Sequence, residues 1–242
     1  MVLINEMMDS DRKAYSLWVD QYEVTNADFY RFITETGYVT TAEKGYTDSL
    51  VGIDSMLKPG SLLFEIPDSV QVDWTITSIW KWKEGADWQD PFGDFSGING
   101  LDDHPVVHIS AEDAEAYAKW TGKRLPKVQE WDQIAKMDSR SGKEREMNRW
   151  TGSFPFINTK EDGFVYTAPV GTYAPDPLNL FDIRGNVWEI CKGEMDTYIL
   201  KGGSFLCHES YCRGYDIQNS QILHGNTSLI HTGFRCVKDH NE

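Results

Sequence analysis

A pair of glycines followed by two cysteines five residues apart is the strongest local constraint in this 242-residue chain. In a helix, Cys207 and Cys212 would lie far apart around the axis, because five steps turn a helix by roughly 500°. In a strand, an odd separation sends the two side chains to opposite faces. The two thiols can therefore act together only from a turn, and Gly202 and Gly203 supply the backbone freedom that such a turn needs.

The spacing alone leaves several interpretations of Cys207 and Cys212 open. Converging thiols can form a disulfide or hold a soft metal ion, and the two cysteines can also be unrelated buried residues. Thiolates favour Cu(I), zinc or iron–sulfur clusters. Zinc would need four ligands, and only His208 lies between the two sulfurs. The other two cysteines, Cys191 and Cys236, could pair with each other or stay reduced.

Longer motifs around the cysteine pair resemble a known family. The runs GGSFLCHESYC (202–212), GFRC (233–236) and GNVWE (185–189) are similar to the active-site region of the formylglycine-generating enzymes, which belong to the sulfatase-modifying factor family. The run YEVTNADF (22–29) resembles the same family. The resemblance implies a copper ion held by the two cysteines, with O2 as the oxidant and a cysteine thiol as the substrate. Many relatives lack the cysteine pair, so its presence here is the specific signal.

The resemblance assigns catalytic roles to four residues. Cys207 and Cys212 would hold Cu(I) and leave room for a third thiolate from the substrate. Ser204 matches a serine beside the metal, and Trp188 matches the tryptophan that lines the oxygen pocket. Removing a hydrogen from the β-carbon of an unactivated cysteine needs a redox metal with O2, because no side chain supplies that oxidising power.

The sequence departs from the family where the substrate should bind. Arginines that follow the second cysteine in the family are replaced here by Gly214, Asp216 and Ser220. This departure predicts that a C-x-P-x-R sulfatase peptide is a poor substrate and that a cationic or small neutral thiol is preferred. The candidate substrate-binding residues are His208, Tyr211, Asp216 and His231.

The resemblance also implies two structural calcium ions, each held by side-chain oxygens and backbone carbonyls. Irregular loops rich in Asp, Asn and Gly suit calcium, although such loops are usually only turns. We call the positions that match the first ion the first calcium set: Asn148, Arg149, Asp162 and Phe164. We call those that match the other ion the second calcium set: Asp182, Gly185, Val187 and Glu189. An aspartate at position 182 replaces the family's asparagine, which keeps an oxygen donor.

Local patterns predict two strands and a helix near the N-terminus. Residues 1–20 contain two short strand candidates. Thr25 or Asn26 can cap a helix over residues 27–33, whose apolar side chains have helical spacing, and Gly37 is expected to end it.

Two more helices are predicted in the middle of the chain. A strand over residues 103–110 is expected to lead into a helix whose first turn carries Ser110 and Asp113 as a capping pair. Gly122 is expected to close this helix, and another is expected to start at residues 124–126.

Little regular structure is predicted for the remaining regions. Residues 45–100 show no clear period, and no long helix is expected after residue 150. Together these patterns predict an α+β protein that forms a single domain over residues 1–242. The family resemblance implies a decorated C-type-lectin-like fold with little regular secondary structure.

Charge and hydropathy restrict the partners. A formal net charge of -15 at pH 7 argues against nucleic acid or an anionic membrane, since both would be repelled. No run is long and apolar enough to span a bilayer, and the N-terminus has no signal-peptide pattern. We expect a cytoplasmic protein, unless a leader precedes this chain.

Two other functions compete with a copper oxidase. One is a non-catalytic binding module on the same scaffold, which failure to bind Cu(I) would favour. The other is an iron-dependent oxidase, which needs a His-rich site. His104 and His108 are too few for such a site, and on a strand they would share one face, so we predict that both are structural histidines.

Overall fold

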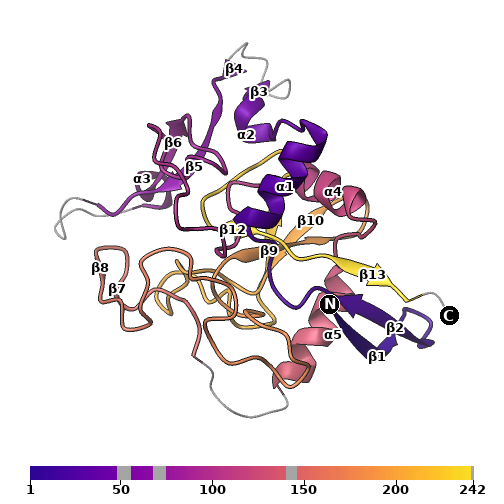
Figure 1. Cartoon of the computed structure of the whole chain (residues 1–242). Coiled ribbons are helices and arrows are strands. Elements are labelled where there is room, and N and C mark those ends of the chain that lie inside the picture. Colours follow the sequence, from indigo (N-terminus) through magenta and orange to yellow (C-terminus); the bar gives the residue numbers. More distant parts are fainter. Residues whose placement is uncertain (48–55, 68–74, 140–145, 241–242) are drawn as a thin grey trace.

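The computed structural model describes residues 1–47, 56–67, 75–139 and 146–240, and Figure 1 shows the arrangement of its elements. Within these residues the strands form a four-stranded sheet, a three-stranded sheet and three two-stranded ribbons. The mixture of helices and strands confirms the α+β prediction in its coarse form.

The four-stranded sheet lies at the centre and has the order β11-β10-β9-β12. Strand β12 runs parallel to β9, and the other two pairings are antiparallel. Neighbouring residues of β9 point to opposite faces, so Ile190 enters one hydrophobic cluster and Cys191 enters another. Because both faces are covered, this strand is buried almost throughout. The strands of this sheet are β9 (Trp188–Lys192), β10 (Tyr198–Lys201), β11 (Gln221–Leu223) and β12 (Thr232–Gly233).

The three-stranded sheet joins the two ends of the chain. Strands β1 (Val2–Met8) and β2 (Ala14–Val19) form an antiparallel hairpin, which confirms the two strands expected in residues 1–20. Strand β13 (Val237–Asp239) pairs with the other side of β2. Strands from the beginning and from the end of the described chain therefore lie side by side in this sheet (Figure 1).

Helix α1 (Asn26–Thr36) has the predicted caps. The Thr25 side chain accepts a hydrogen bond from the Asp28 N–H, and Gly37 ends the helix at a φ of 65°.

Helix α4 (Ala111–Trp120) also has its predicted start, because Ser110 and Asp113 form a reciprocal capping box. Gly122 follows its end at a φ of 68°. Both cap predictions, for α1 and for α4, are confirmed.

Helix α5 (Val128–Ser139) starts later than predicted. Residues 124–127 form bridges with Val237 and Lys192 instead of helical turns. The Lys127 N–H donates to the Glu130 carboxylate at 2.8 Å, as the first residue of a capped helix would. The expected start at residues 124–126 was therefore wrong because strand-like pairing holds this segment extended.

The strand predicted over residues 103–110 does not form. Only Pro105 makes a β-bridge, with Thr25, and His108 has a φ of 58°, which an extended strand does not allow. His104 and His108 therefore do not share a strand face.

The prediction that these two histidines are structural is nevertheless supported. His104 Nδ1 lies 2.9 Å from the Thr167 hydroxyl. His108 is fully buried, and its Nε2–H donates to the Pro91 carbonyl at 2.8 Å while its Nδ1 accepts from the Ser61 hydroxyl at 2.8 Å.

Residues 45–100 contain more regular structure than predicted. Strands β5 (Gly60–Phe64) and β6 (Trp80–Glu84) form an antiparallel hairpin. Part of the region, 48–55 and 68–74, lies outside the described residues. The short elements in and beside the region are α2 (Thr41–Lys44), β3 (Tyr46–Thr47), β4 (Met56–Leu57) and α3 (Ile76–Ile79).

The second half of the chain is mostly loops. Residues 146–240 form no helix, as predicted for the chain after residue 150. Besides the sheets, they contain only the ribbon of β7 (Gly152–Ser153) and β8 (Ile157–Asn158). These loops carry the candidate site residues.

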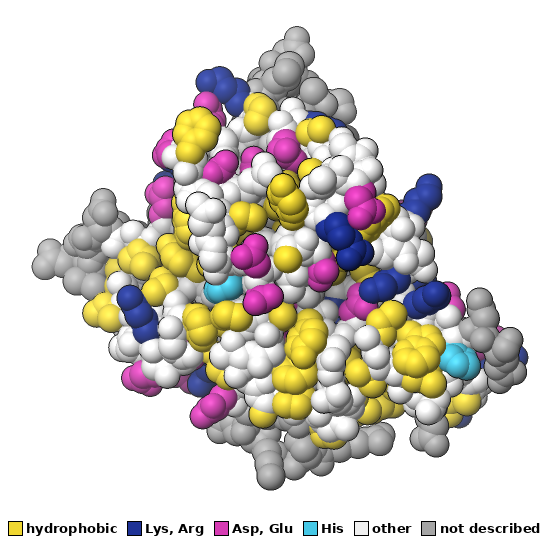
Figure 2. All heavy atoms as spheres, viewed as in Figure 1, with side chains coloured by type: hydrophobic (Ala, Val, Ile, Leu, Met, Phe, Trp, Pro, Cys, Tyr) yellow, Lys and Arg dark blue, Asp and Glu magenta, His cyan; other side chains and the backbone are white. Residues whose placement is uncertain are grey.

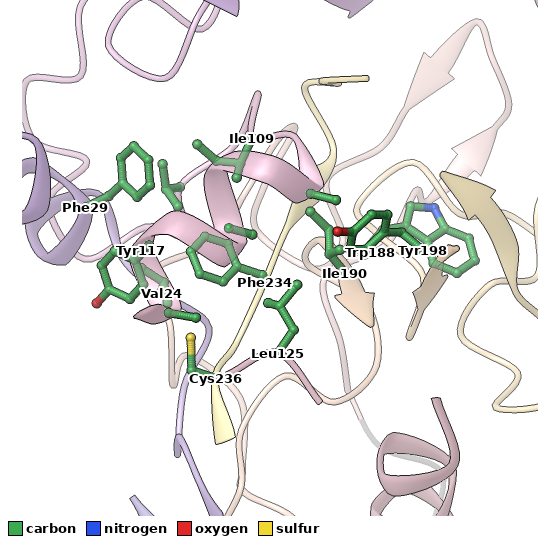
Figure 3. Close-up of a cluster of buried hydrophobic side chains, with 14 of the residues drawn as sticks. Val24, Phe29, Ile109, Tyr117, Leu125, Trp188, Ile190, Tyr198, Phe234 and Cys236 are labelled. Carbon is green, nitrogen blue, oxygen red and sulfur yellow. The ribbon is translucent and has the colours of Figure 1, made fainter. Parts of the chain in front are cut away.

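One hydrophobic cluster fills the space between α1, α4 and the central sheet (Figure 3). Phe29 of α1 stacks on Tyr117 of α4 with ring centroids 5.9 Å apart, and Tyr117 meets Phe234 edge-on at 5.3 Å. Because Trp188 and Cys207 belong to the same cluster, this packing fixes one wall of the candidate site.

Charged side chains are dispersed over the surface of the protein. On the face seen in Figure 2, acidic side chains are spread out, with Lys and Arg among them. None of the helices in the described ranges combines the length and apolar character that a membrane crossing requires.

Candidate active site

The two cysteines of the GGSFLCHESYC run converge, as two cooperating thiols require. Their sulfur atoms lie 3.1 Å apart and both thiols are free. A turn brings them together: the Cys212 N–H donates to the His208 carbonyl at 2.9 Å. The glycine pair is needed here, since Gly203 has a φ of 80° and an added Cβ would lie 2.5 Å from the Tyr215 nitrogen.

Burial and hydrogen bonds shift the pKa values of the two thiols in opposite directions. Cys207 is buried, and this burial raises its pKa well above the ordinary value. The hydrogen bond from Cys207 lowers the pKa of Cys212, and the Gln221 side-chain amide acts in the same direction from 3.6 Å. The Ser204 N–H donates to the Cys207 sulfur at 3.3 Å. The site therefore offers donors that favour negative sulfur.

Ser204 and Trp188 lie beside the thiols. Ser204 is fully buried, and its hydroxyl accepts from the Leu206 N–H at 3.3 Å. The Trp188 ring fills the space next to Gly214, where an added Cβ would lie 2.3 Å from the ring. The glycine at position 214, one of the departures from the family pattern, is therefore the residue that this packing allows.

A cavity of about 790 Å³ opens next to the two sulfurs. It is enclosed by the hairpin of β5 and β6, by the sheet strands β9 to β11 and by the loops 204–214 and 227–231. Its apolar lining residues are Leu62, Trp80, Trp188, Leu200, Leu206, Ile222, Leu223 and Leu229. Its polar lining residues besides the cysteines and Gly214 are Ser204, Tyr211, Arg213, Asn219, Ser220, Gln221, His224, Thr227 and His231.

The structure brings only two of the four candidate substrate residues into this cavity, Tyr211 and His231. His208 is not part of the lining, and its Nδ1 lies 2.8 Å from the Ser210 hydroxyl. Asp216 is also absent from the lining, and its carboxylate pairs with Arg213 at 3.1 Å. The expected attraction of a cationic thiol by Asp216 therefore lacks a free carboxylate facing the cavity.

His231 is a neutral wall residue. Burial lowers its pKa to about 3, and His108 acts in the same direction. Its ring meets Trp80 edge-on with centroids 4.7 Å apart, and the Trp80 indole N–H donates to the Tyr211 hydroxyl at 3.2 Å. These contacts hold three cavity residues in one rigid group.

The first calcium set is assembled in part. The Asp162 carboxylate accepts hydrogen bonds from the Arg149 N–H at 2.9 Å and the Phe164 N–H at 3.2 Å. It therefore lies against the two residues whose carbonyls would complete the set. Asn148 is buried beside them, and its amide donates to the Asn186 side chain at 3.0 Å.

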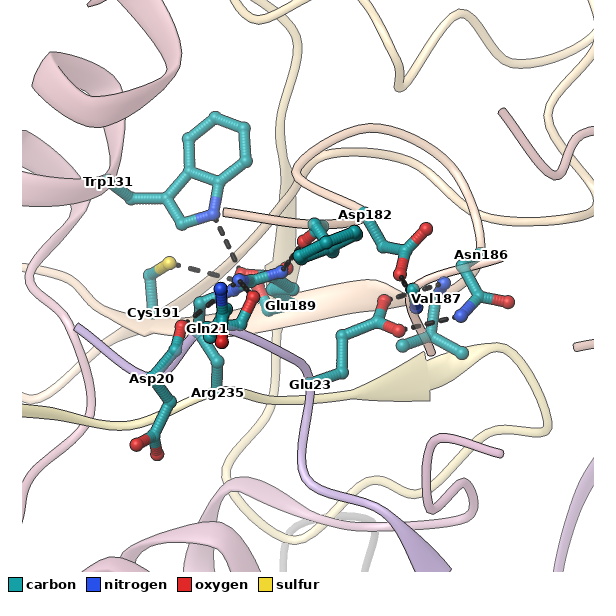
Figure 4. Close-up of polar contacts among 12 residues, drawn as sticks. Asp20, Gln21, Glu23, Trp131, Asp182, Asn186, Val187, Glu189, Cys191 and Arg235 are labelled. Atoms are coloured by element: carbon teal, nitrogen blue, oxygen red, sulfur yellow. Dashed lines mark hydrogen bonds and ion pairs between the residues drawn. The ribbon is translucent and has the colours of Figure 1, made fainter. Parts of the chain in front are cut away.

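The second calcium set is organised around an ion pair (Figure 4). Arg235 and Glu189 are each 1% exposed, and the Arg235 Nε lies 2.8 Å from both carboxylate oxygens of Glu189. The Trp131 indole N–H donates to the same carboxylate at 2.9 Å. Asp182 accepts from the Gly171 N–H at 2.9 Å. The Glu189 carboxylate is therefore already bound by Arg235 and Trp131, and its role as a calcium ligand stays a prediction.

Sequence reasoning missed Glu23, which lies against the second set (Figure 4). This carboxylate is buried and accepts from the Asn186 side chain at 2.6 Å and from the Val187 N–H at 3.3 Å. Burial raises its pKa well above the ordinary value, and the carboxylates of Asp182 and Glu189 raise it further. The available signal was a glutamate inside the YEVTN run, directly before a buried valine.

Within the described residues, no three His, Cys, Asp or Glu side chains converge as a ready-made metal site. A copper ion would therefore depend on the two cysteines, and a calcium ion on backbone carbonyls together with single side-chain oxygens.

Comparison with protein families matches residues 5–240 to the family described as "Sulfatase-modifying factor enzyme 1-like domain". The chain belongs to the sulfatase-modifying factor family. The resemblance read from the cysteine, GFRC and GNVWE motifs is thereby confirmed.

Two relatives in the sulfatase-modifying factor family differ in what their names say. The chain is 37% identical to the "Formylglycine-generating enzyme" of Thermomonospora curvata, over 91% of this chain and 81% of that protein. It is 34% identical to the "Inactive C-alpha-formylglycine-generating enzyme 2" of Bos taurus, over 90% of this chain and 76% of that protein. Family membership therefore does not decide by itself whether a member is active.

A solved structure supports the fold at low sequence identity. PvdO from Pseudomonas aeruginosa superimposes with a TM-score of 0.55 at 14% identity, covering 98% of this chain and 91% of that one. The likeness concerns the fold alone.

Proposed function

We propose that this member of the sulfatase-modifying factor family is a copper-dependent oxidase that uses O2 to convert a cysteine thiol to an aldehyde. The observation that carries the proposal is the pair of free thiols, 3.1 Å apart, at the wall of a cavity large enough for a peptide segment. The relative named formylglycine-generating enzyme in Thermomonospora curvata supports an aldehyde as the product.

The donor set fits copper. Two thiols that converge from one turn are soft ligands, which suit Cu(I), whereas zinc would lack ligands among the neighbouring side chains that the structure describes. When bound, the copper ion would supply the redox chemistry with O2 that side chains cannot provide.

The chain's own residues would hold and shield the reacting groups. Cys207 and Cys212 would bind the metal, while the Ser204 N–H and the Gln221 amide donate to their sulfurs and stabilise negative charge there. Trp188 would keep the wall beside the thiols dry, since its ring leaves no space next to Gly214.

The reaction requires a second source of electrons. Converting a thiol carbon to an aldehyde and releasing hydrogen sulfide removes two electrons from the substrate. Reducing O2 completely to water takes four electrons. We therefore propose that a thiol reductant supplies the other two and leaves as a disulfide.

Calcium and the scaffold complete the proposal. A structural calcium ion would bind at the first calcium set, where Asp162 already lies against Arg149 and Phe164. At the second set, Asp182, Glu189 and the carbonyls of Gly185 and Val187 would hold the other ion, and the Glu189 carboxylate would be shared with Arg235. We propose a C-type-lectin-like scaffold for these loops.

The substrate would differ from the sulfatase motif. Positions 214, 216 and 220 lack the arginines found in the family, and Ser220 and Gly214 line the cavity. The second candidate function is a non-catalytic binding module, and the relative named inactive in Bos taurus favours it. The free thiol pair counts against that alternative.

Anaerobic titration with Cu(I) against a chromophoric chelator tests the metal centre. We expect one Cu(I) per chain, and we expect Cys207→Ser or Cys212→Ser to abolish tight binding while the fold is kept. Cys191→Ser is a matched control, because Cys191 is a buried free thiol of a different cluster. Wild-type affinity in either active-site variant would contradict the paired-thiolate site and favour the binding module.

A further inference from the structure

The cavity beside the thiols carries no acidic side chain among the described residues that line it. Part of its wall is made of apolar residues from β5, β10, β11 and the loop before β12: Leu62, Leu200, Leu223 and Leu229. A cationic group placed against this wall would lose its water without gaining a counter-ion, which is strongly unfavourable. The wall therefore discriminates against a basic residue next to the substrate cysteine.

The charged group at the cavity is already neutralised. The Arg213 guanidinium, which lines the cavity, pairs with the Asp216 carboxylate at 3.1 Å. His231 contributes an uncharged ring that packs on Trp80. An anionic substrate group would share Arg213 with Asp216, whose charge already offsets that of the guanidinium, so the described lining offers no uncompensated charge of either sign.

The rim of the cavity exposes an apolar side chain. Ile222 of the edge strand β11 lines the cavity, yet 75% of its surface is exposed. A neighbouring apolar group on a bound ligand would cover it and gain the associated free energy. The cavity volume of about 790 Å³ exceeds what a free cysteine would fill and suits a peptide segment.

We propose that the substrate is a peptide thiol whose residues next to the cysteine are apolar and uncharged. This inference rests on the proposed function for its chemistry, although the binding preference can be measured without turnover. It excludes the cationic part of the expectation from the sequence, a cationic or small neutral thiol, since Asp216, which suggested a cation, is not in the lining and pairs with Arg213.

Peptides that differ only in their flanking residues test the proposal. Three fluorescent peptides with serine in place of the cysteine would carry leucine, arginine or aspartate on both sides, and fluorescence anisotropy would give their Kd. We expect the leucine peptide to bind at least about tenfold more tightly than either charged one. The corresponding cysteine peptides would then be compared for turnover.

Two pairs of variants locate the effect in the cavity. Ile222→Ser should weaken binding of the leucine peptide, whereas Ile157→Ser should not, because Ile157 is a 54% exposed isoleucine outside the cavity lining. Ser220→Asp should improve binding of the arginine peptide, and Asn226→Asp, outside the lining, should leave it unchanged. Neither Ile222 nor Ser220 is a residue that we assign to the thiol chemistry.

The outcomes separate this inference from the proposed function. Equal or tighter binding of a charged peptide, or no binding of any of the three, would overturn the substrate class. Selective binding of the leucine peptide without turnover of its cysteine form would support the substrate class and contradict the oxidase. Turnover of all three peptides with equal kcat/KM would support the oxidase and overturn the substrate class.

Discussion

The buried ion pair between Arg235 and Glu189 predicts a large stability effect. The Arg235 Nε donates to both carboxylate oxygens of Glu189 at 2.8 Å, and its Nη2 also donates to the Phe181 carbonyl at 2.8 Å. Arg235→Met would remove these bonds and leave Glu189 buried with only the Trp131 N–H as a described side-chain donor. The nearby buried carboxylate of Glu23 would then repel it without an opposing charge.

The expected loss follows from breaking a buried pair. Removing one partner of such a pair costs about 3–5 kcal/mol, because the other charge stays buried and uncompensated. For a chain of this size, about 1 kcal/mol shifts Tm by about 2–4 °C, so Arg235→Met should lower Tm by about 6–20 °C. Thermal unfolding followed by circular dichroism, with calcium chelated in all samples, measures this shift apart from metal binding.

A second arginine provides the matched control. Arg213 also pairs with a carboxylate, but 60% of its side chain is exposed, so Arg213→Met should cost at most about 1 kcal/mol. Replacing both Arg235 and Glu189 with methionine should recover part of the loss, since no unpaired charge from the pair remains. Equal Tm values for Arg235→Met and Arg213→Met would refute the reasoning.

Three further predictions concern calcium, pH and substrate. Excess chelator should lower Tm if calcium is bound, and Asp162→Ala should remove part of that response, whereas an unchanged Tm would contradict exchangeable calcium. The folded-state pKa of His108 is about 4, below its ordinary value of 6.5. Its contribution to the free energy of unfolding is therefore complete above pH 6.5 and is lost as the pH falls toward 4. Urea unfolding should therefore show a loss of roughly 3 kcal/mol from this group between pH 7 and pH 4 that is absent in His108→Gln, and equal losses in both proteins would contradict it. A C-x-P-x-R peptide should be turned over poorly with copper and O2 saturating, and its efficient conversion to formylglycine would show that the loop after Cys212 was misinterpreted.

Caps and turns were predictable because their signals are local. Thr25 and Gly37 bound α1, and Ser110 with Asp113 starts α4, as their side chains dictate within a few residues. The spacing of the two cysteines indicated that they could act together only from a turn, whereas the prediction that they do act together rested on the family resemblance.

The missed features depend on distant partners or on a signal that was overlooked. Trp80 and Trp82 alternate with lysines, a period of two that indicates β6, although the surrounding region has no period. The strand expected over 103–110 failed because His108 turns into the left-handed region to reach Pro91 and Ser61. No local sequence pattern predicts such contacts.

The charged residues of the site also have partners that single motifs did not indicate. Glu189 matches a calcium position by motif, and its carboxylate also binds Arg235, 46 residues later in the chain. Asp216 suggested a cationic substrate, yet Arg213 stands three residues before it and pairs with it. The second pair could have been recognised from its spacing, whereas the first could not.

The central claim, copper-dependent oxidation of a thiol by O2, is tested most directly by turnover of a leucine-flanked cysteine peptide. O2 uptake and aldehyde formation, detected with an oxime-forming probe, would be measured together in the presence of a thiol reductant. We predict that aldehyde forms only when Cu(I), O2 and both Cys207 and Cys212 are present. Aldehyde formation by the copper-free protein, or neither aldehyde nor O2 uptake with any thiol peptide after Cu(I) has bound, would contradict the account.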